Sequence, residues 1–255
     1  MIRFSSVAKS WDGRRVVGPL SFEVAKGEFV ALLGGSGCGK TTTLKMVNGL
    51  ITPNEGEVTV DGGPAGFEAL WALRRRIGYV FQEVGLFPHL SIAENIAVGP
   101  RLAGWSKART AERVGELLDL VDLPRDIGER RPSALSGGQR QRVGVARALG
   151  AGPTVMLMDE PFGALDPATR DALGHDYRAL HDRLSLTTMM VTHDVTEALL
   201  LADRIIVMEA GYFVADGTPS ELLSQTAAPA IRALMETPLR QAARIGALSR
   251  GAAHG

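Results

Sequence analysis

A glycine-rich run at residues 34–41 contains the residue types that can hold a chain of phosphates. It consists of Gly34, Gly35, Ser36, Gly37, Cys38, Gly39, Lys40 and Thr41, and it fits the pattern G-x-x-x-x-G-K-[ST]. Glycines let backbone N–H groups turn toward phosphate oxygens, and the N-terminus of a following helix adds a favourable dipole. Lys40 would reach the β- and γ-phosphates, and the Thr41 hydroxyl would contact Mg²⁺. The run, with the adjoining Thr42, predicts a nucleotide site; the alternative is a glycine-rich turn that happens to carry a lysine.

Two adjacent carboxylates, Asp159 and Glu160, follow a second apolar run at residues 155–158. Open parallel sheets place their ligands at the carboxyl ends of the strands. Because Mg²⁺ prefers carboxylate oxygens and usually keeps several waters, Asp159 would hold the water shell of the metal. Glu160 could polarise an attacking water. Without the phosphate loop, a strand followed by an acidic turn would be the simpler interpretation.

A third cluster, Leu135 to Gln139, precedes an expected helix at residues 140–149. Ser136 is a natural N-cap for that helix. The free N–H groups beside Gly137 and Gly138 would form a second anion site. Taken alone, however, the cluster indicates only a capped helix with a flexible start.

The hydrophobic pattern predicts the elements that position these residues. A short apolar run ends at Gly34, as in a buried parallel strand, and a helix should follow it. Helical spacing replaces strand-like runs between residues 87 and 149, so we expect a helical insertion in an α/β domain. The predicted strands are 29–33, 57–60, 77–81, 155–158, 188–191 and 205–208, with a hairpin arm at 212–215; the predicted helices include 41–50 and a segment carrying Val114, Leu117, Leu118 and Val121.

Composition excludes several classes of protein. A chain of 255 residues that is 45% hydrophobic can bury a sizeable core. Its 28 basic and 28 acidic residues balance, so no overall field favours nucleic acid or an anionic membrane. The one cysteine, Cys38, is interpreted as a small filler and excludes both an internal disulfide and a multi-cysteine metal site. No signal peptide or run of roughly 20 apolar residues is recognisable, so a soluble, cytoplasmic chain is expected.

The phosphate loop, the L-S-G-G-Q cluster and the strand-borne Asp-Glu pair together resemble the ATP-binding subunits of ATP-binding-cassette (ABC) transporters, over roughly residues 2–225. The resemblance implies an α/β fold of the P-loop NTPase type, with a mostly parallel sheet and an antiparallel β edge. It implies a RecA-like core at residues 1–86 and 155–226, an inserted α-helical subdomain at 87–154, and a short helical tail at 227–255. It also implies hydrolysis of ATP with Mg²⁺.

The same resemblance assigns further site residues. Ser136 to Gln139 look like the signature motif, which completes the ATP site of the partner subunit in a head-to-tail homodimer, and Asp166 lies in the loop that crosses the dimer interface. Gln82 resembles the family's glutamine at the metal, and His193 resembles its switch histidine at the γ-phosphate. Trp11 stands where the family stacks an aromatic ring on adenine, with core packing as the alternative. The implied catalytic residues are Lys40, Gln82, Glu160 and His193, and the implied metal residues are Thr41, Gln82 and Asp159.

Shorter segments are similar to one branch, the importers of osmoprotectants such as glycine betaine, choline and carnitine. Examples are Gly85 to His89, Gly104-Trp105 and Gly163 to Pro167. This likeness implies integral membrane permease subunits as partners, contacted through a groove at Gln82 and residues 85–89. It also implies a peripheral position on the cytoplasmic side of the cell membrane, an extracytoplasmic solute-binding protein as an indirect partner, and no nucleic acid.

Three alternative functions can be weighed against this one from the sequence. The cargo could be another small polar solute, such as an amino acid. A chromosome-maintenance ATPase of the same family would need a long heptad-rich insertion, which is absent here. A small-molecule kinase would explain the phosphate loop but would leave the L-S-G-G-Q cluster and His193 without a role.

Overall fold

The computed structural model describes residues 1–64 and 70–224, together with 228–229, 231–237, 240 and 243–244. Within the expected C-terminal tail, residues 231–237 are helical. The remainder of that tail prediction lies mostly outside the described residues. None of the helices in the described ranges combines the length and apolar character that crossing a bilayer requires.

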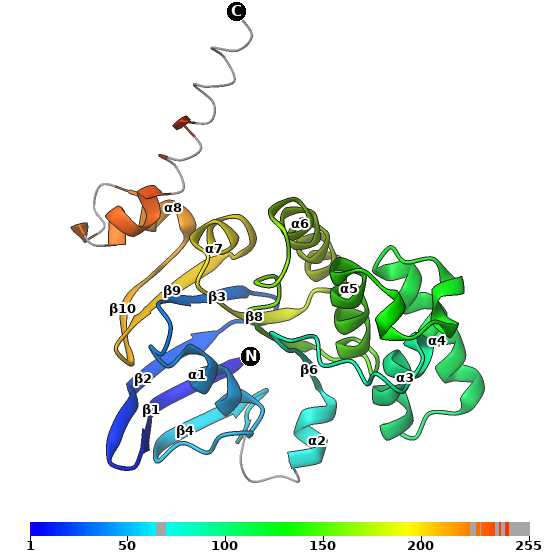
Figure 1. Ribbon diagram of the computed structural model, residues 1–255. Coiled ribbons are helices and arrows are strands. Elements are labelled where there is room, and N and C mark those ends of the chain that lie inside the picture. Colours follow the sequence, from blue (N-terminus) through cyan, green and yellow to red (C-terminus); the bar gives the residue numbers. More distant parts are fainter. Residues whose placement is uncertain (65–69, 225–227, 230, 238–239, 241–242, 245–255) are drawn as a thin grey trace, which may run out of the picture.

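A six-stranded sheet, ordered β10-β9-β3-β8-β7-β6, forms the centre of the molecule (Figure 1). All neighbouring pairs in it are parallel except β10 and β9, which form an antiparallel hairpin at one edge. Its strands are β3 (Phe29–Gly34), β6 (Ile77–Val80), β7 (Val155–Asp159), β8 (Thr187–Thr192), β9 (Arg204–Glu209) and β10 (Tyr212–Gly217). The predicted α/β fold, with a mostly parallel sheet and an antiparallel edge, is confirmed.

Both faces of this sheet are buried at its central strands β3, β7 and β8, which explains the continuous apolar runs at β3 and β7. On one face, Phe29 and Leu33 belong to a cluster that includes residues of α6 (Pro167–Leu184) and α7 (Val195–Leu201). On the other face, Val30 and Leu32 pack with a second sheet and with α1 (Lys40–Val47). The phosphate loop, the Asp159–Glu160 pair and His193 lie at or directly after the carboxyl ends of these buried strands.

The second sheet is antiparallel and has the order β2-β1-β4-β5. Its strands are β1 (Ile2–Trp11), β2 (Arg14–Val24), β4 (Glu55–Val60) and β5 (Gly63–Pro64). Neither β1 nor β2 was predicted from the sequence. In β1 the pairing register shifts between Phe4 and Val7, and Ser6 has a positive φ of 49°. This irregularity breaks the two-residue alternation by which a half-buried strand is recognised.

The helical insertion lies beside one edge of the six-stranded sheet (Figure 1). It contains α3 (Ile92–Leu102), α4 (Lys107–Leu120), two short 3₁₀ helices (Arg125–Glu129 and Pro132–Ala134) and α5 (Gly137–Ala148), while α2 (Leu70–Arg75) precedes β6 and α8 (Pro219–Leu223) follows β10. Val114, Leu117 and Leu118 are buried on one side of α4, as their spacing predicts.

Two predicted helix boundaries are wrong by a few residues. The first helix ends at Val47 rather than at residue 50, because Asn48 caps it and Gly49 takes a left-handed φ of 65°. The helix expected from residue 140 begins at Gly137, because Ser136 caps it and the two glycines form its first turn.

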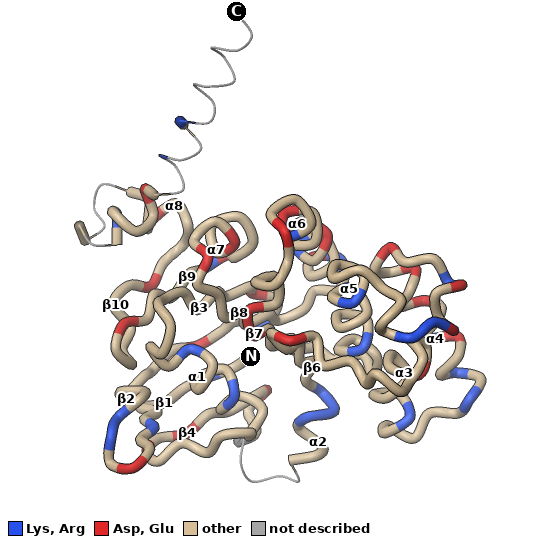
Figure 2. Tube along the Cα trace, viewed as in Figure 1, with Lys and Arg blue, Asp and Glu red and all other residues tan. Residues whose placement is uncertain are grey.

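Figure 2 shows acidic and basic residues interspersed along the chain, in keeping with the balanced charge.

Candidate nucleotide site

The phosphate loop joins the end of β3 to the start of α1, as the sequence predicts. Gly39 is the N-cap of α1, with a φ of 101°, and no side chain caps the helix. The first N–H groups of α1 are therefore open to a ligand. A Cβ on Gly39 would lie 2.8 Å from the carbonyl oxygen of Val16, and a Cβ on Gly34 would lie 2.3 Å from that of Met208. Both positions require glycine because neighbouring backbone approaches closely.

Replacing Gly39 by Ala should lower the free energy of unfolding by about 2 kcal/mol, because a Cβ is strained at this φ and contacts the Val16 carbonyl. Gly35→Ala is the matched control in the same loop: a Cβ there has no heavy atom within 4 Å, and its φ is not in the left-handed range. The measurement is the urea midpoint of the purified variants. Equal urea midpoints for the two variants would contradict the claim that the loop requires glycine at position 39.

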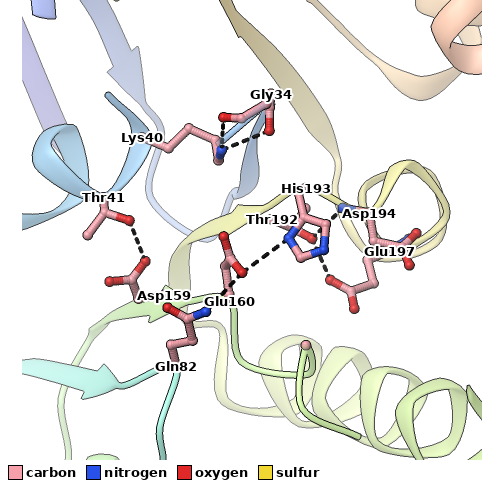
Figure 3. Close-up of polar contacts among 12 residues, drawn as sticks. Gly34, Lys40, Thr41, Gln82, Asp159, Glu160, Thr192, His193, Asp194 and Glu197 are labelled. Atoms are coloured by element: carbon pink, nitrogen blue, oxygen red, sulfur yellow. Dashed lines mark hydrogen bonds and ion pairs between the residues drawn. The ribbon is translucent and has the colours of Figure 1, made fainter. Parts of the chain in front are cut away.

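Lys40, the first residue of α1, is folded back over the loop (Figure 3). Its Nζ donates hydrogen bonds to the carbonyl oxygens of Gly34 and Gly35, each at 2.8 Å. Its third neighbour is Cys38 Sγ at 3.8 Å, a weak acceptor. Cys38 is buried in the core beneath the loop, so its side chain is the small filler that the sequence analysis described.

Asp159 lies at the end of β7 and is held through both carboxylate oxygens. The Thr41 hydroxyl donates to Oδ1 at 2.8 Å, and the Tyr79 hydroxyl donates to Oδ2 at 3.2 Å. Burial, followed by the charge of Asp159 and the hydrogen bond to it, raises the pKa of Tyr79, so the phenol stays protonated as a donor.

The oxygens of Thr41 and Asp159 are of the hard type that Mg²⁺ prefers. Among the described residues there is no group of three or more His, Cys, Asp or Glu side chains able to hold a metal ion. This donor set therefore fits a magnesium that takes its remaining ligands from phosphate oxygens and water, and it does not fit a metal bound wholly by protein.

Glu160 directly follows Asp159 but has a left-handed φ of 46°. Its backbone N–H donates to the carbonyl of Val191 at 2.9 Å, which fixes the turn. Its Oε2 accepts a hydrogen bond from Gln82 Nε2 at 3.2 Å and lies 3.1 Å from His193 Nδ1 (Figure 3). The positive φ is a conformation in which backbone strain is commonly stored at functional sites. Gln82 and His193, which were predicted separately, thus meet at the carboxylate of Glu160.

A polar network that was not predicted from the sequence holds the end of β8 behind His193. The Thr192 hydroxyl donates to Glu197 Oε2 at 2.6 Å and accepts the backbone N–H of Asp194 at 3.0 Å. Asp194 caps α7 and pairs with Arg170 at 3.0 Å, while Arg170 also donates to the carbonyl of Leu165 at 3.2 Å. Burial raises the pKa of Glu197. The one available signal was Asp194 as the N-cap of a helix.

One cavity of about 720 Å³ brings most of the predicted residues together. It is lined by residues of the phosphate loop and by Gln82, Glu160 and His193, and it adds Val16, which was not predicted. Its lining residues are Val16, Gly35, Ser36, Gly37, Gly39, Lys40, Thr41, Thr42, Gln82, Glu160 and His193.

Trp11 is not among these lining residues. Its side chain is about 50% exposed, and Lys9 Nζ lies 4.3 Å from its ring centroid. The alternative that Trp11 packs in the core is therefore wrong. Its stacking on a base stays a prediction.

The L-S-G-G-Q cluster and Asp166 also lie apart from the lining of this cavity. Ser136 and Gln139 form a reciprocal cap of α5, with hydrogen bonds of 3.2 and 3.0 Å. Asp166 caps α6 by accepting the N–H of Thr169. Hydrogen bonding from the side chain of Thr169, followed by that from its backbone, lowers the pKa of the Asp166 carboxyl. A Cβ on Gly138 would lie 2.7 Å from Thr169 Cγ2, so the two caps are neighbours. Within one copy, neither cap contributes a residue to the lining of the cavity at the phosphate loop.

Comparison with known proteins decides the family. A family model described as ABC transporter matches residues 17–163, more than half of the chain. The chain belongs to the ABC transporter family.

Curated ABC relatives match most of the chain. The glycine betaine/carnitine/choline transport ATP-binding protein OpuCA of Bacillus subtilis (strain 168) is 48% identical over 228 residues, which are 89% of this chain and 60% of OpuCA. The glycine betaine uptake system ATP-binding protein YehX of Escherichia coli (strain K12) is 47% identical over 232 residues, which are 91% of this chain and 75% of YehX. This ABC chain thus spans less than two thirds of the length of OpuCA. The resemblance to the osmoprotectant branch is confirmed.

A solved ABC structure shares the fold. It is the dimeric structure of a post-hydrolysis state of the ATP-binding cassette MJ0796 bound to ADP and Pi. It is 30% identical to this chain with a TM-score of 0.78, and the match covers 86% of this chain and 99% of that one. The expected P-loop NTPase architecture is therefore that of an ABC cassette.

Proposed function

We propose that the chain hydrolyses ATP with Mg²⁺ and so drives uptake of a quaternary amine osmoprotectant through a separate permease. The observation that carries the ATPase part is the convergence of Gln82, Glu160 and His193 on the cavity of the phosphate loop. The solute class rests on the names of the relatives, since OpuCA and YehX are both described as glycine betaine transport proteins.

In the proposed reaction, the loop N–H groups and Lys40 bind the β- and γ-phosphates, and Trp11 stacks on the base. Thr41 and Asp159 would hold Mg²⁺, with Gln82 beside it, and the metal would neutralise charge on the phosphate oxygens. Phosphoryl transfer then depends on positioning and charge stabilisation more than on covalent chemistry.

Glu160 orients a water for attack on the γ-phosphorus and accepts its proton as the new P–O bond forms. The bond between the γ-phosphorus and the β–γ bridging oxygen breaks, which yields ADP and phosphate. His193, 3.1 Å from the same carboxylate oxygen, contacts the γ-phosphate. The network of Thr192, Asp194 and Glu197 keeps the histidine at this place.

We further propose that two copies of the chain share each ATP site, head to tail. Ser136–Gln139 and Asp166 cap helices and do not line the cavity of the phosphate loop, which supports this arrangement. The relative bound to ADP and Pi is described as dimeric. In the homodimer, the glycine N–H groups at the start of α5 would meet the γ-phosphate held by the other copy.

The permease would contact a groove of about 690 Å³ beside the edge strand β6. Of the residues predicted for this contact, Gly85 and Phe87 line the groove, whereas Gln82 lines the nucleotide cavity. Exposed apolar side chains line it, including Trp71, Phe81, Phe87 and Leu102. Arg147 braces the segment between core and insertion by donating to the carbonyls of Val84 and Gly85. We propose that residues 1–86 and 155–226 move as the core and 87–154 as the helical subdomain. The chain would then sit on the cytoplasmic face of the cell membrane, with the solute-binding protein only an indirect partner.

Uptake by a deletion strain tests the proposal. Cells that lack the gene should lose uptake of radiolabelled betaine or choline, and the wild-type gene should restore it. A permease and a solute-binding protein should copurify with the chain from membranes. If the deletion strain instead loses amino acid uptake, the cargo is another polar solute. Unchanged uptake of every solute, with no permease in the purified material, would overturn the transport role.

A further inference from the structure

Strand register brings Tyr79 toward the end of β7. The strands β6 and β7 are parallel, and Tyr79 is paired with Leu157. Side chains two residues apart point to the same face of a sheet, so Asp159 lies on the face of Leu157, one step further along. A tyrosine is long enough to cover that step, and its hydroxyl lies 3.2 Å from Asp159 Oδ2.

The two hydrogen bonds to Asp159 fix the rotation of its carboxylate. Thr41 holds Oδ1 at 2.8 Å, and Tyr79 holds Oδ2. A phenol has an ordinary pKa near 10 and is protonated at neutral pH, so here it donates and the carboxylate accepts. Without the phenol, the carboxylate could turn about its last side-chain bond, which is a soft torsion.

We propose that Tyr79 is a positioning residue for the magnesium of the ATP site, an inference that rests on the proposed function. It holds one oxygen of Asp159 so that the other stays beside Thr41. Groups that orient metal ligands from behind commonly contribute a factor of about 10 to 100 in metal affinity or activity.

The ring of the same tyrosine forms part of the wall of the groove beside β6. It packs on Phe81 with ring centroids 4.5 Å apart and an interplanar angle of 44°. Tyr79 thus reaches from the wall of this groove to a residue of the metal site. A segment seated in the groove would touch the side chain that holds Asp159.

Tyr79→Phe tests the assignment because it removes only the hydroxyl. Binding of a non-hydrolysable ATP analogue is measured by calorimetry, once in EDTA and once across a series of Mg²⁺ concentrations. We expect unchanged affinity in EDTA and a roughly tenfold higher Mg²⁺ concentration for half-maximal enhancement of binding. Equal Mg²⁺ dependence in variant and wild type would overturn the assignment, and so would an equal loss of affinity with and without the metal.

Tyr177→Phe is the matched control. Tyr177 is buried in the other hydrophobic cluster, and its hydroxyl lies 2.9 Å from Thr188 Oγ1, a contact that does not involve Asp159. This variant should keep the wild-type Mg²⁺ dependence, and a shift as large as that of Tyr79→Phe would overturn the assignment. If the wild-type chain itself binds no analogue, the proposed ATPase function fails; if only the Tyr79 effect is missing, the inference alone fails.

Discussion

Glu160→Gln should leave ATP binding intact and lower the turnover number by a factor of about 10² to 10⁴, the usual contribution of a general base. The amide is nearly the same size as the carboxylate and can still interact with Gln82 and His193, which now lie 3.2 and 3.1 Å from Oε2. It cannot accept a proton from the attacking water. The variant should therefore accumulate as an ATP-bound closed dimer.

Phosphate release and size-exclusion chromatography in the presence of ATP and Mg²⁺ measure the two effects. Glu209→Gln is the matched control, because Glu209 also ends a strand at the carboxyl edge of the sheet but is exposed and does not line the cavity. Glu209→Gln should hydrolyse ATP at the wild-type rate, and its ATP-bound dimer should be only transient. Normal hydrolysis by Glu160→Gln would remove Glu160 from the role of base.

The parts of the site that depend on local sequence were predictable. The phosphate loop is specified by consecutive residues, since the glycines, Lys40 and the start of α1 all follow one strand. The Asp-Glu pair was found in the same way, because an apolar strand buried on both faces leads directly to it. Ser136 was predictable as an N-cap for the same reason: its partner, Gln139, is three residues away.

Contacts between distant residues were not predictable from local pattern. Tyr79 and Asp159 are 80 residues apart, and only the parallel pairing of β6 with β7 brings them together. The pairing of Arg170 with Asp194 likewise requires α6 and the end of β8 to meet. Within the strand at residues 77–80, a half-buried tyrosine such as Tyr79 is an ordinary residue type. Nothing in its immediate neighbours distinguishes a packing tyrosine from one that holds a carboxylate.

The paired caps at Ser136 and Asp166 show a further limit of sequence reasoning. They were assigned to the ATP site by resemblance, whereas within one copy they neighbour each other and do not line the cavity of the phosphate loop. A site divided between two copies is invisible to any pattern in one chain, because the pattern carries no information on how copies associate. One copy shows only what a shared ATP site would need, namely a capped helix start whose glycine N–H groups do not line the cavity of the phosphate loop.

Lys40→Met should weaken ATP binding by a factor of about 10 to 100, since a hydrogen bond to a charged group contributes about 1.5 to 3 kcal/mol. The ammonium group has three N–H donors. Two are used by the carbonyls of Gly34 and Gly35, and the third faces Cys38 Sγ at 3.8 Å. A phosphate oxygen is a far stronger acceptor than a thiol, so the third donor is the one that a nucleotide would recruit.

The methionine keeps the length of the side chain but loses its charge and all three donors. Two effects then combine: the phosphates lose their cation, and the carbonyls of Gly34 and Gly35 lose the donor that holds the loop closed. Lys45→Met, on the last turn of the same helix, removes an equal charge away from the cavity lining and should leave binding unchanged. Calorimetric titration with ATP and Mg²⁺ separates the two variants. Because the loop carbonyls are also released, the loss for Lys40→Met should persist in EDTA, whereas that for Tyr79→Phe should vanish there. Equal losses for Lys40→Met and Lys45→Met would show that net charge, and not the geometry of the loop, holds the nucleotide.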